Sequence, residues 1–326
     1  MITHVQQGIA VAAVGAALFL AISPIPASAD TALTVGKANA TSDAIIPVNV
    51  GDQLGIFKKH GLDLKITDFS GGGKSAQAMA AGAIDIEDGA GTEMAFVAKG
   101  APMLAVCEST GPAPFMGIGV PWDSPIHSLQ DLKGKIIGVS SPGSFSDWLG
   151  HELARKKGWG ENGVKTVAIG GSTAATTAAF RAHQVDADIG GATQFFAMEE
   201  TKTGRLLTSV SAYEGNVASG VLFASNKLIA SNPGALRAFL AGWIETVDYM
   251  RAHKAETVKI ESGITHFDEN VMSRQYDLVI GMYTKACRFD AESLAALKRS
   301  FVELKLLDSE PDMSKLYTEK FLPPAK

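Results

Sequence analysis

The chain has 326 residues, of which 46% are hydrophobic and 19% charged, and its formal net charge is -5 at pH 7. This length is sufficient for two domains with separate cores, and the composition is that of a globular α/β protein. The negative charge and the lack of a basic run with interleaved aromatic residues argue against nucleic acid as a partner.

Residues 1–29 differ from the rest of the chain. The stretch 9–22 is almost wholly apolar, is too short to span a bilayer comfortably, and is followed by the small residues 27–29. An apolar core before a small-residue cleavage site is typical of a secretory signal peptide. We therefore expect cleavage after Ala29 and a mature chain that begins at Asp30; an uncleaved N-terminal anchor is the alternative.

The chain has two cysteines, Cys107 and Cys287. They cannot make a disulfide framework and are not spaced as metal ligands. A single bridge is possible in an oxidising compartment, but we expect two buried thiols. None of the seven histidines pairs with another at metal-ligand spacing, so no metal site is expected.

Short strand-like runs alternate with helical runs from Asp30 onward. The first helical stretch ends at Gly61, and an alanine-rich one ends at Ala81. Such alternation predicts a parallel or mostly parallel sheet with helices on both faces. The expected strands are residues 33–37, 62–68, 84–87 and 103–107.

The stretch 124–148 couples a strand to a polar loop and the start of a helix. Residues 135–139 are the strand, and Ser144 has the position of an N-cap with Asp147 three residues later. Gly158 fits the end of this helix. Free backbone N–H groups and the positive end of the helix dipole then meet at one point, which favours a small polar or anionic ligand. An ordinary capped loop is the alternative.

A repeat appears at a spacing of about one hundred residues. Residues 78–85 align with 179–186 without a gap, and the loop 39–43 aligns with the loop before Ser144 at a slightly larger shift. We infer two lobes built on one βα plan, with their ligand loops in equivalent places. The first shift also aligns Gly89 with Gly190, Thr92 with Thr193, and Glu93 with Gln194.

The last third of the chain is expected to be a strand at 220–225 followed by helices. Asn232 and Pro233 fit the cap and first turn of a long helix, and the pattern stays helical to about Tyr317. We identify no ligand-binding loop in this helical remainder. The apolar stripe of the long helix is Leu236, Phe239, Leu240, Trp243, Val247 and Met250.

Several weak patterns become specific through their order and spacing. They are residues 55–63 (GIFKKHGLD), 81–85 (AGAID), 124–126 (SPI) with 128–135 (SLQDLKGK), 185–187 (VDA) and 231–233 (SNP). Over nearly all of its mature length the chain resembles the periplasmic substrate-binding proteins of ABC importers. The resemblance is to the SsuA/THI5-like (NMT1-like) group, which handles sulfonates, taurine, nitrate and the thiamine-precursor pyrimidine.

The resemblance implies a two-lobed periplasmic binding protein fold of type II. Each lobe is then a mixed sheet flanked by helices, and two crossing strands near 115–121 and 220–225 join the lobes. Lobe 1 is expected to comprise residues 30–119 and 222–326, and lobe 2 residues 120–221.

The resemblance also implies a periplasmic monomer that captures a small organic molecule in the interlobe cleft and delivers it to an ABC permease. It implies no cofactor and no catalysis. A ligand-binding sensor or chemoreceptor partner is the alternative. A second alternative is a pyrimidine-synthase-like enzyme on the same fold, but such enzymes have a cysteine cluster that this chain does not match. The run 73–75 suggests a phosphate loop, but that pattern needs glycine where the chain has Asp68.

In open α/β sheets a ligand sits beyond the carboxyl ends of the strands, where helices begin. This rule, applied to both lobes, selects the candidate ligand-binding residues Ser42, Asp43, Ser70, Gly71, Gly72, Gly73, Thr92, Glu93, Ser141, Ser144, Phe145, Ser172, Thr173, Thr193 and Gln194.

Simpler roles compete with several of these predictions. The serines at 144 and 172 could be N-caps, the glycines 71–73 could only permit a turn, and Phe145 could belong to the core. Glu93 either pairs with a cation of the ligand or caps its own helix. In the first case an amine or a pyrimidine N–H is favoured over a plain sulfonate.

Overall fold

The computed structural model describes residues 1–2, 30–39, 42–69, 71–160, 162–215 and 217–324. Nearly all of the expected signal peptide lies outside these residues, and so does Ser70. Among the residues described, no helix is both long enough and apolar enough to cross a membrane.

The first sheet has the strand order β2-β1-β3-β10-β4. Strand β1 pairs in parallel with β2 and β3, whereas β10 runs antiparallel to β3 and β4. The expected strands are present, but the first begins two residues earlier than expected, the third lies two residues further along the chain, and the fourth ends three residues later. The strands are β1 (Thr31–Lys37), β2 (Leu62–Asp68), β3 (Ile86–Gly89), β4 (Met103–Thr110) and β10 (Gly220–Ser225).

The second sheet repeats this order as β7-β6-β8-β5-β9. Strand β6 pairs in parallel with β7 and β8, and β5 is antiparallel to β8 and β9. Each sheet is therefore mixed, as expected, with its one antiparallel strand in the fourth place. The strands are β5 (Met116–Pro121), β6 (Ile136–Val139), β7 (Lys165–Ala168), β8 (Ala187–Gly191) and β9 (Gly204–Ser209).

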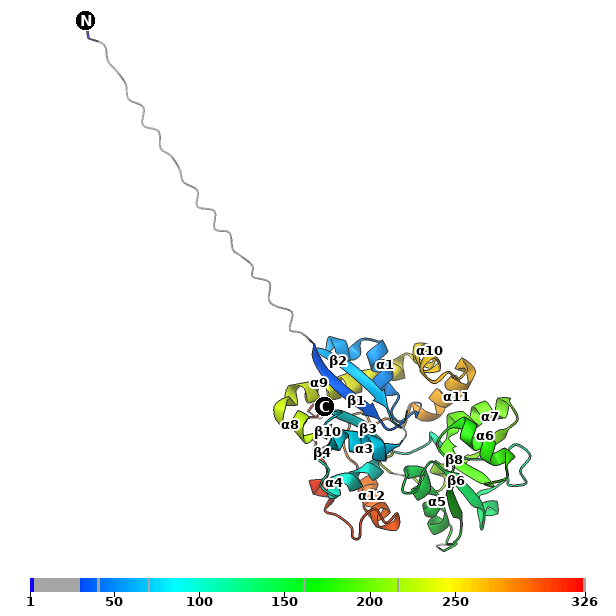
Figure 1. Cartoon of the computed structure of the whole chain (residues 1–326). Helices are drawn as coiled ribbons and strands as arrows, with labels where there is room; N and C mark the ends of the chain where they lie inside the picture. The colour runs from blue at the N-terminus through cyan, green and yellow to red at the C-terminus, as the bar shows by residue number, and fades with distance from the viewer. Residues whose placement is uncertain (3–29, 40–41, 70, 161, 216, 325–326) are drawn as a thin grey trace.

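The two sheets form the two bodies seen in Figure 1, which we call lobe 1 and lobe 2. Strands β5 and β10, at the two places where crossing was expected, are the antiparallel members of the two sheets. The chain crosses next to them, at residues 111–115 and again between Ala212 and Gly220. The expected limits 119/120 and 221/222 thus fall inside β5 and β10, because an apolar run predicts a strand but not the sheet that it joins. Phe115 and Val217 are buried within the crossing segments.

Helices cover both sheets and form most of the C-terminal third. Lobe 1 contains α1 (Pro47–Gln53), α2 (Ile56–Lys59), α3 (Gly72–Ala80), the 3₁₀ turn η1 (Gly91–Glu93) and α4 (Met94–Ala98). Lobe 2 contains η2 (Leu129–Leu132), α5 (Phe145–Lys156), α6 (Thr173–Arg181), α7 (Ala192–Glu200) and η3 (Val210–Ala212). The C-terminal helices are α8 (Asn226–Ser231), α9 (Pro233–Ala252), α10 (Lys254–Thr265), α11 (Glu269–Val279), α12 (Ala291–Glu303) and the 3₁₀ turn η4 (Met313–Lys315).

Helix α9 forms as its sequence predicts. The Asn232 side chain accepts a hydrogen bond from the N–H of Ala235, 3.1 Å away, and Pro233 is the first helical residue. The apolar stripe is buried, and Phe239 stacks on Phe57 of α2 with 5.2 Å between the ring centres. This stripe anchors the C-terminal third to lobe 1.

The α-helical pattern ends earlier than expected. Helix α12 ends at Glu303, and the chain beyond it runs along the edge of β4. Ala105 donates its N–H to the carbonyl of Leu316 at 3.1 Å and accepts the N–H of Thr318 at 2.9 Å. Residues up to Tyr317 were expected to be helical; the open edge of β4 supplies backbone partners that the local sequence does not reveal.

The repeat predicted from the sequence coincides with the structure. Helices α3 and α6 begin and end 101 residues apart, and β3 and β8 begin 101 residues apart. In each lobe an aspartate fastens the turn before the third parallel strand. Asp85 accepts the N–H of Thr34 at 3.0 Å, and Asp186 accepts the N–H of Ile136 at 2.9 Å. The repeated aspartate therefore has a structural role, tying this turn to β1 and β6.

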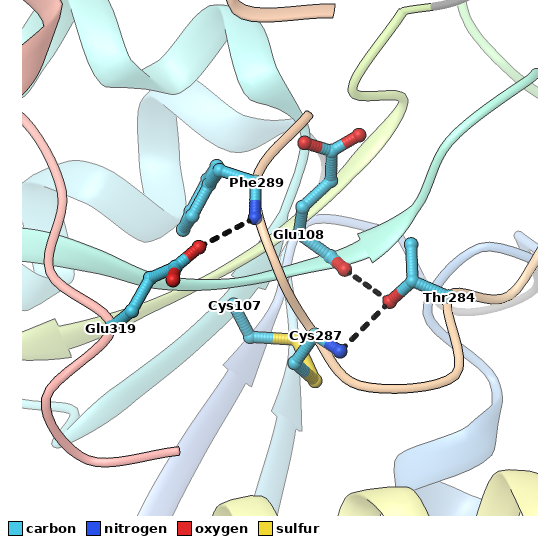
Figure 2. Close-up of a disulfide and its surroundings, with 6 residues drawn as sticks. All are labelled: Cys107, Glu108, Thr284, Cys287, Phe289 and Glu319. Atoms are coloured by element: carbon cyan, nitrogen blue, oxygen red, sulfur yellow. Dashed lines mark hydrogen bonds between the residues drawn. A yellow bond between two sulfur atoms is a disulfide. The ribbon is translucent and has the colours of Figure 1, made fainter. Parts of the chain in front are cut away.

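The two cysteines are joined in a disulfide, with 4.5 Å between the Cα atoms of Cys107 and Cys287 (Figure 2). The expectation of two buried thiols is therefore wrong, although both cysteines are fully buried. Pairing depends on β4 meeting the segment before α12, 180 residues later in the chain. Thr284 supports this contact, because its Oγ1 donates to the carbonyl of Glu108 at 2.5 Å and accepts the N–H of Cys287 at 3.1 Å.

Candidate functional site

The predicted residues that the structure describes all follow the carboxyl ends of the parallel strands. In lobe 1, Ser42 and Asp43 follow β1, Gly71, Gly72 and Gly73 follow β2, and Thr92 and Glu93 follow β3. In lobe 2, Ser141, Ser144 and Phe145 follow β6, Ser172 and Thr173 follow β7, and Thr193 and Gln194 follow β8. Ser70 lies outside the described residues.

Two of these residues, one from each lobe, meet at the ends of the sheets. Thr193 Oγ1, in the first turn of α7, donates a hydrogen bond of 3.3 Å to Asp43 Oδ2. The residues are 150 positions apart in the sequence, and both are buried. Through this bond, the side chain of Asp43 marks the place where the C-terminal ends of the strands of both sheets come together.

The polar loops after β1, β6 and β7 also come together. A Cβ atom added at Gly171 would lie 4.0 Å from Asn39 Nδ2 and 3.5 Å from Ser140 Cβ. Asn39 and Ser140 were not among the predicted site residues, although each lies in a loop that the sequence had singled out. Asn39 and Ser140 therefore lie where the loops of the two lobes approach each other.

Helix α11 contributes to the surroundings of Asp43. Gln275 is fully buried, and its side-chain amide lies beside the Asp43 carboxyl group and helps to lower the pKa of that group. Tyr283 donates its hydroxyl to the Asp43 carbonyl at 2.6 Å. The sequence predicted no site chemistry in the helical remainder, because a glutamine inside a helical pattern carries no signal of what it will face.

Burial raises the pKa of Asp43 to about 7, against the lowering effect of its hydrogen bonds. Burial also raises the pKa of Glu261, on α10, to about 8, and the neighbouring Asp43 contributes to this rise. These two buried carboxyl groups therefore carry less negative charge at neutral pH than exposed carboxyl groups would.

Ser144 and Ser172 act as N-caps, the simpler of their two expected roles. The N–H of Asp147 donates to Ser144 Oγ at 3.3 Å, and the N–H of Ala175 donates to Ser172 Oγ at 3.2 Å. A capping hydroxyl uses its oxygen as acceptor and keeps its own proton as a donor. Ser172 can therefore cap its helix and still donate to a ligand, whereas the Ser144 hydroxyl also shares a hydrogen bond of 3.1 Å with Ser146 Oγ.

Phe145 packs as a core residue. Its ring is half-buried and stacks on Trp148 with 5.8 Å between the ring centres. Trp148 is 1% exposed, and its Nε1 donates to Glu303 Oε2 of α12 at 3.2 Å. This hydrogen bond joins lobe 2 to the C-terminal part of lobe 1, and Phe145 packs against the tryptophan that makes it.

Glu93 caps its own turn. Its carboxylate accepts the N–H of Ala90, at the start of η1, and its side chain is 7% exposed. A Cβ atom at Gly72 or at Gly89 would overlap the Glu93 carboxyl group. Two glycines thus provide room for a buried glutamate, and the geometry supports capping over contact with a ligand cation.

A hollow of about 550 Å³ lies elsewhere, between β7 and α6. Its lining includes Val167, Ile169 and Ala175, and contains none of the predicted site residues. The hollow has no charged side chain in its lining and is separate from the convergence at Asp43.

Comparison with known sequences gives the family. The sequence model described as NMT1/THI5 like matches residues 43–257, about two thirds of the chain. The chain belongs to the NMT1/THI5-like family. The match begins at Asp43 and covers the ends of all the parallel strands except β1.

Relatives and structural neighbours agree with this family. A Brucella abortus protein named as a binding protein is 25% identical over 222 residues, which cover 68% of this chain and 67% of its own. The alkanesulfonate-binding protein SsuA of Xanthomonas axonopodis pv. citri, solved with MOPS bound, has a TM-score of 0.71 at 20% identity. That comparison covers 90% of this chain and 99% of SsuA. The fold is that of the periplasmic binding proteins.

An enzyme also shares this fold. The desulfurization enzyme DszB has a TM-score of 0.62 at 15% identity, over 88% of this chain and 97% of its own. The family and its relatives support a ligand-binding role, and the fold by itself does not separate binding from catalysis.

Proposed function

We propose that the protein is an extracytoplasmic solute-binding protein that captures a small organic molecule in its interlobe cleft. The observation that carries this proposal is the hydrogen bond between Asp43 and Thr193, which brings the carboxyl ends of both sheets to one place. A ligand that contacts both lobes there favours closure by its differential affinity for the closed state. The closed form is then presented to an ABC permease in the periplasm, and the protein acts as a monomer.

The chemistry of the predicted residues bears on the ligand class. Apart from Asp43 and the capping Glu93, they offer hydroxyls, one amide, an aromatic ring and backbone N–H groups. Such groups bind an oxyanion without the cost of burying an unpaired cation. Sulfonate, taurine, nitrate and pyrimidine-like molecules are all consistent with this set, and Asp43 favours those with an N–H donor.

A catalytic role is less consistent with the residues present. Both cysteines of the chain are consumed by the disulfide, so no thiol is available for the cysteine cluster of the pyrimidine synthases. A ligand-binding sensor would use the same cleft, and a permease-binding assay separates it from a transport subunit.

A thermal-shift panel on the chain from Asp30 tests the proposed function. The compounds are alkanesulfonates, taurine, nitrate, aromatic carboxylates, aminopyrimidines and riboflavin. At one hundred times its dissociation constant, a ligand is expected to add about 2.7 kcal/mol to the free energy of unfolding and to raise the Tm by several degrees. The exposed Ser141 provides a control, because Ser141→Ala should leave the ligand-free Tm unchanged and reduce the shift. A flat panel with a folded protein contradicts the proposed ligand classes.

Closure can be followed separately through Trp148. Trp148 is 1% exposed in this structure and its indole N–H donates to Glu303 across the lobes, so we expect an open form to expose the indole ring and ligand-induced closure to bury it. We expect ligand to shift tryptophan emission to shorter wavelength in the wild type and in Trp243→Phe, but not in Trp148→Phe. Trp243 is a matched control, since it is equally buried but lies on α9 within lobe 1. A bound ligand with no emission shift and an unchanged radius in small-angle scattering would contradict closure.

A further inference from the structure

Three charged side chains lie side by side at the carboxyl edge of the sheet in lobe 1. They are Lys37, the last residue of β1, Asp68, the last residue of β2, and Asp88 on β3. Strand β1 lies between β2 and β3, and Lys37 is paired in register with Asp68 on one side and Asp88 on the other. Residues paired in this way point to the same face of a sheet. The lysine therefore has a carboxyl group on each side.

The lysine pairs with the more exposed of the two carboxyl groups. Lys37 Nζ lies 3.3 Å from Asp68 Oδ1, and the side chains of Lys37 and Asp68 are 1% and 49% exposed. Asp88 is fully buried, and neither of its carboxyl oxygens has a hydrogen-bond partner among the described residues. Buried polar groups in folded proteins are nearly always hydrogen-bonded, so Asp88 requires an explanation.

Lobe 2 has none of these charges at the equivalent positions. Val139 ends β6 and is paired with Ala168, which ends β7. Ile189 takes the place of Asp88, at the shift of 101 residues, and both Val139 and Ile189 are buried. The same sheet edge is thus built with apolar side chains, which are often as stable as a buried ion pair. The charges of lobe 1 therefore indicate a role other than holding the sheet together.

The charged edge of lobe 1 is the edge that lobe 2 approaches. Asp68 directly precedes the loop 69–73, and Gly71 of this loop donates its N–H to the carbonyl of Ala38 at 2.8 Å. Asn39, two residues after Lys37, lies close to the position that a Cβ atom at Gly171 of lobe 2 would take. The exposed Asp68 carboxylate therefore lies among the loops at which the two lobes meet.

A ligand in the cleft can reach Asp68 but not the buried Lys37 or Asp88. A group that competes with Lys37 for the Asp68 carboxylate must be a cation. Lys37 need not lose its ion pair in that exchange, because the strands are about 4.8 Å apart and Asp88 lies on the next one. Burial raises the pKa of Asp88 well above its usual range, and the positive charge of Lys37 lowers it. The lysine would give Asp88 the donor that it lacks.

We propose that Asp68 binds an ammonium or amidinium group of the ligand, and that Lys37 then turns from Asp68 to Asp88. The proposal rests on the proposed function and narrows its ligand to a small organic cation or zwitterion. Lys37 and Asp88 are positioning residues, since they do not contact the ligand but keep the lysine charge paired when Asp68 is taken.

A double-mutant cycle tests the exchange without any ligand. Urea unfolding at pH 7 is measured for the wild type, Asp68→Asn, Asp88→Asn and the double variant. We expect each single substitution to change the unfolding constant by less than about tenfold, because the remaining carboxylate pairs with Lys37. The double substitution leaves a buried lysine without a carboxylate and should raise the constant by about a hundredfold or more. Lys37→Met in the double variant removes the charge and should restore most of the stability.

Additive effects of the two substitutions would overturn the exchange. If Lys37 were fixed on Asp68, Asp68→Asn alone would produce the whole loss of stability, and Asp88→Asn would add nothing to it. A double variant that does not fold supports the proposal if Lys37→Met restores folding and contradicts it if Lys37→Met does not.

Taurine and ethanesulfonate test the cationic ligand, because the two molecules differ only in the ammonium group of taurine. We expect taurine to raise the Tm of the wild type more than ethanesulfonate does, and the two shifts to become equal in Asp68→Asn. Asp88→Asn should weaken taurine binding by about tenfold, although Asp88 is buried, because Lys37 then has no second carboxylate to pair with. Equal shifts by the two compounds in the wild type would overturn the cation site.

The failures of the two proposals are distinguishable. A wild type that responds to no compound of the panel contradicts the proposed function and, with it, the cation site. Taurine binding that Asp68→Asn leaves unchanged contradicts the cation site alone. The double-mutant cycle decides the exchange in either case.

Discussion

Reduction of the Cys107–Cys287 disulfide is expected to lower the free energy of unfolding by about 4 kcal/mol. The bond closes a loop of 180 residues that contains the whole of lobe 2, and loop closure restricts the unfolded chain more as the loop grows. Thr284 and the strand β4 hold the two ends of the loop in place in the folded chain. Reduction therefore acts mainly by increasing the conformational entropy of the unfolded chain. For a chain of this size the Tm should fall by about 6 °C.

Urea unfolding with and without dithiothreitol measures this effect. Because both cysteines are fully buried, the reductant is added to unfolded protein before refolding. The double variant Cys107→Ala, Cys287→Ala is the control, and its stability should match that of the reduced wild type and not respond to reductant. Equal unfolding midpoints for oxidised and reduced wild type would contradict the prediction.

The attachment of α12 to β4 depends on Glu108 and not on the disulfide. Its carboxylate accepts the N–H of Asp290 at 2.9 Å and the hydroxyl of Ser293 at 2.9 Å, at the start of α12. Reduction leaves these hydrogen bonds in place. The reduced protein should therefore remain folded, with α12 still docked on β4.

The features that the sequence predicted well are those with local causes. The caps at Ser144, Ser172 and Asn232 formed because the hydroxyl or amide and the N–H groups that it accepts are within one turn. The repeat was predictable because the turns at Asp85 and Asp186 make equivalent hydrogen bonds to the neighbouring strand in the two lobes. Strand alternation and chain order then place the ligand-side loops at one end of each sheet.

The features that the sequence did not predict depend on contacts between distant segments. Cys107 meets Cys287, Asp43 meets Gln275, and the end of the chain meets β4, and nothing within a few residues of any of these signals its partner. The two roles open to Glu93 were both chemically reasonable. Only the direction of the side chain distinguishes them, and that direction is set by the room that Gly72 and Gly89 leave.

Gly72→Ala is expected to lower the free energy of unfolding by about 3 kcal/mol, whereas the neighbouring Gly73→Ala should raise it by up to about 1 kcal/mol. A Cβ atom at Gly72 displaces the buried Glu93 carboxyl group, which then loses its hydrogen bond from the Ala90 N–H. At Gly73 the new Cβ meets only the Phe96 ring, at an ordinary 3.8 Å, and alanine favours the helix. The two substitutions are chemically identical and adjacent, so helix propensity alone cannot make their signs differ.

A double-mutant cycle with Glu93→Ala tests whether Glu93 is the cause. Once the carboxyl group is gone, the space beside Gly72 is free, and Gly72→Ala should become neutral or slightly stabilising. The coupling free energy between the two positions is then about 3 kcal/mol, at the upper end for residues in direct contact. A cost of Gly72→Ala that persists in the Glu93→Ala background would contradict this interpretation and would mean that glycine is needed there for the backbone itself. Urea unfolding at pH 6, which is below the pKa of about 7 to which burial raises Glu93, limits the contribution of Glu93 titration to the cycle.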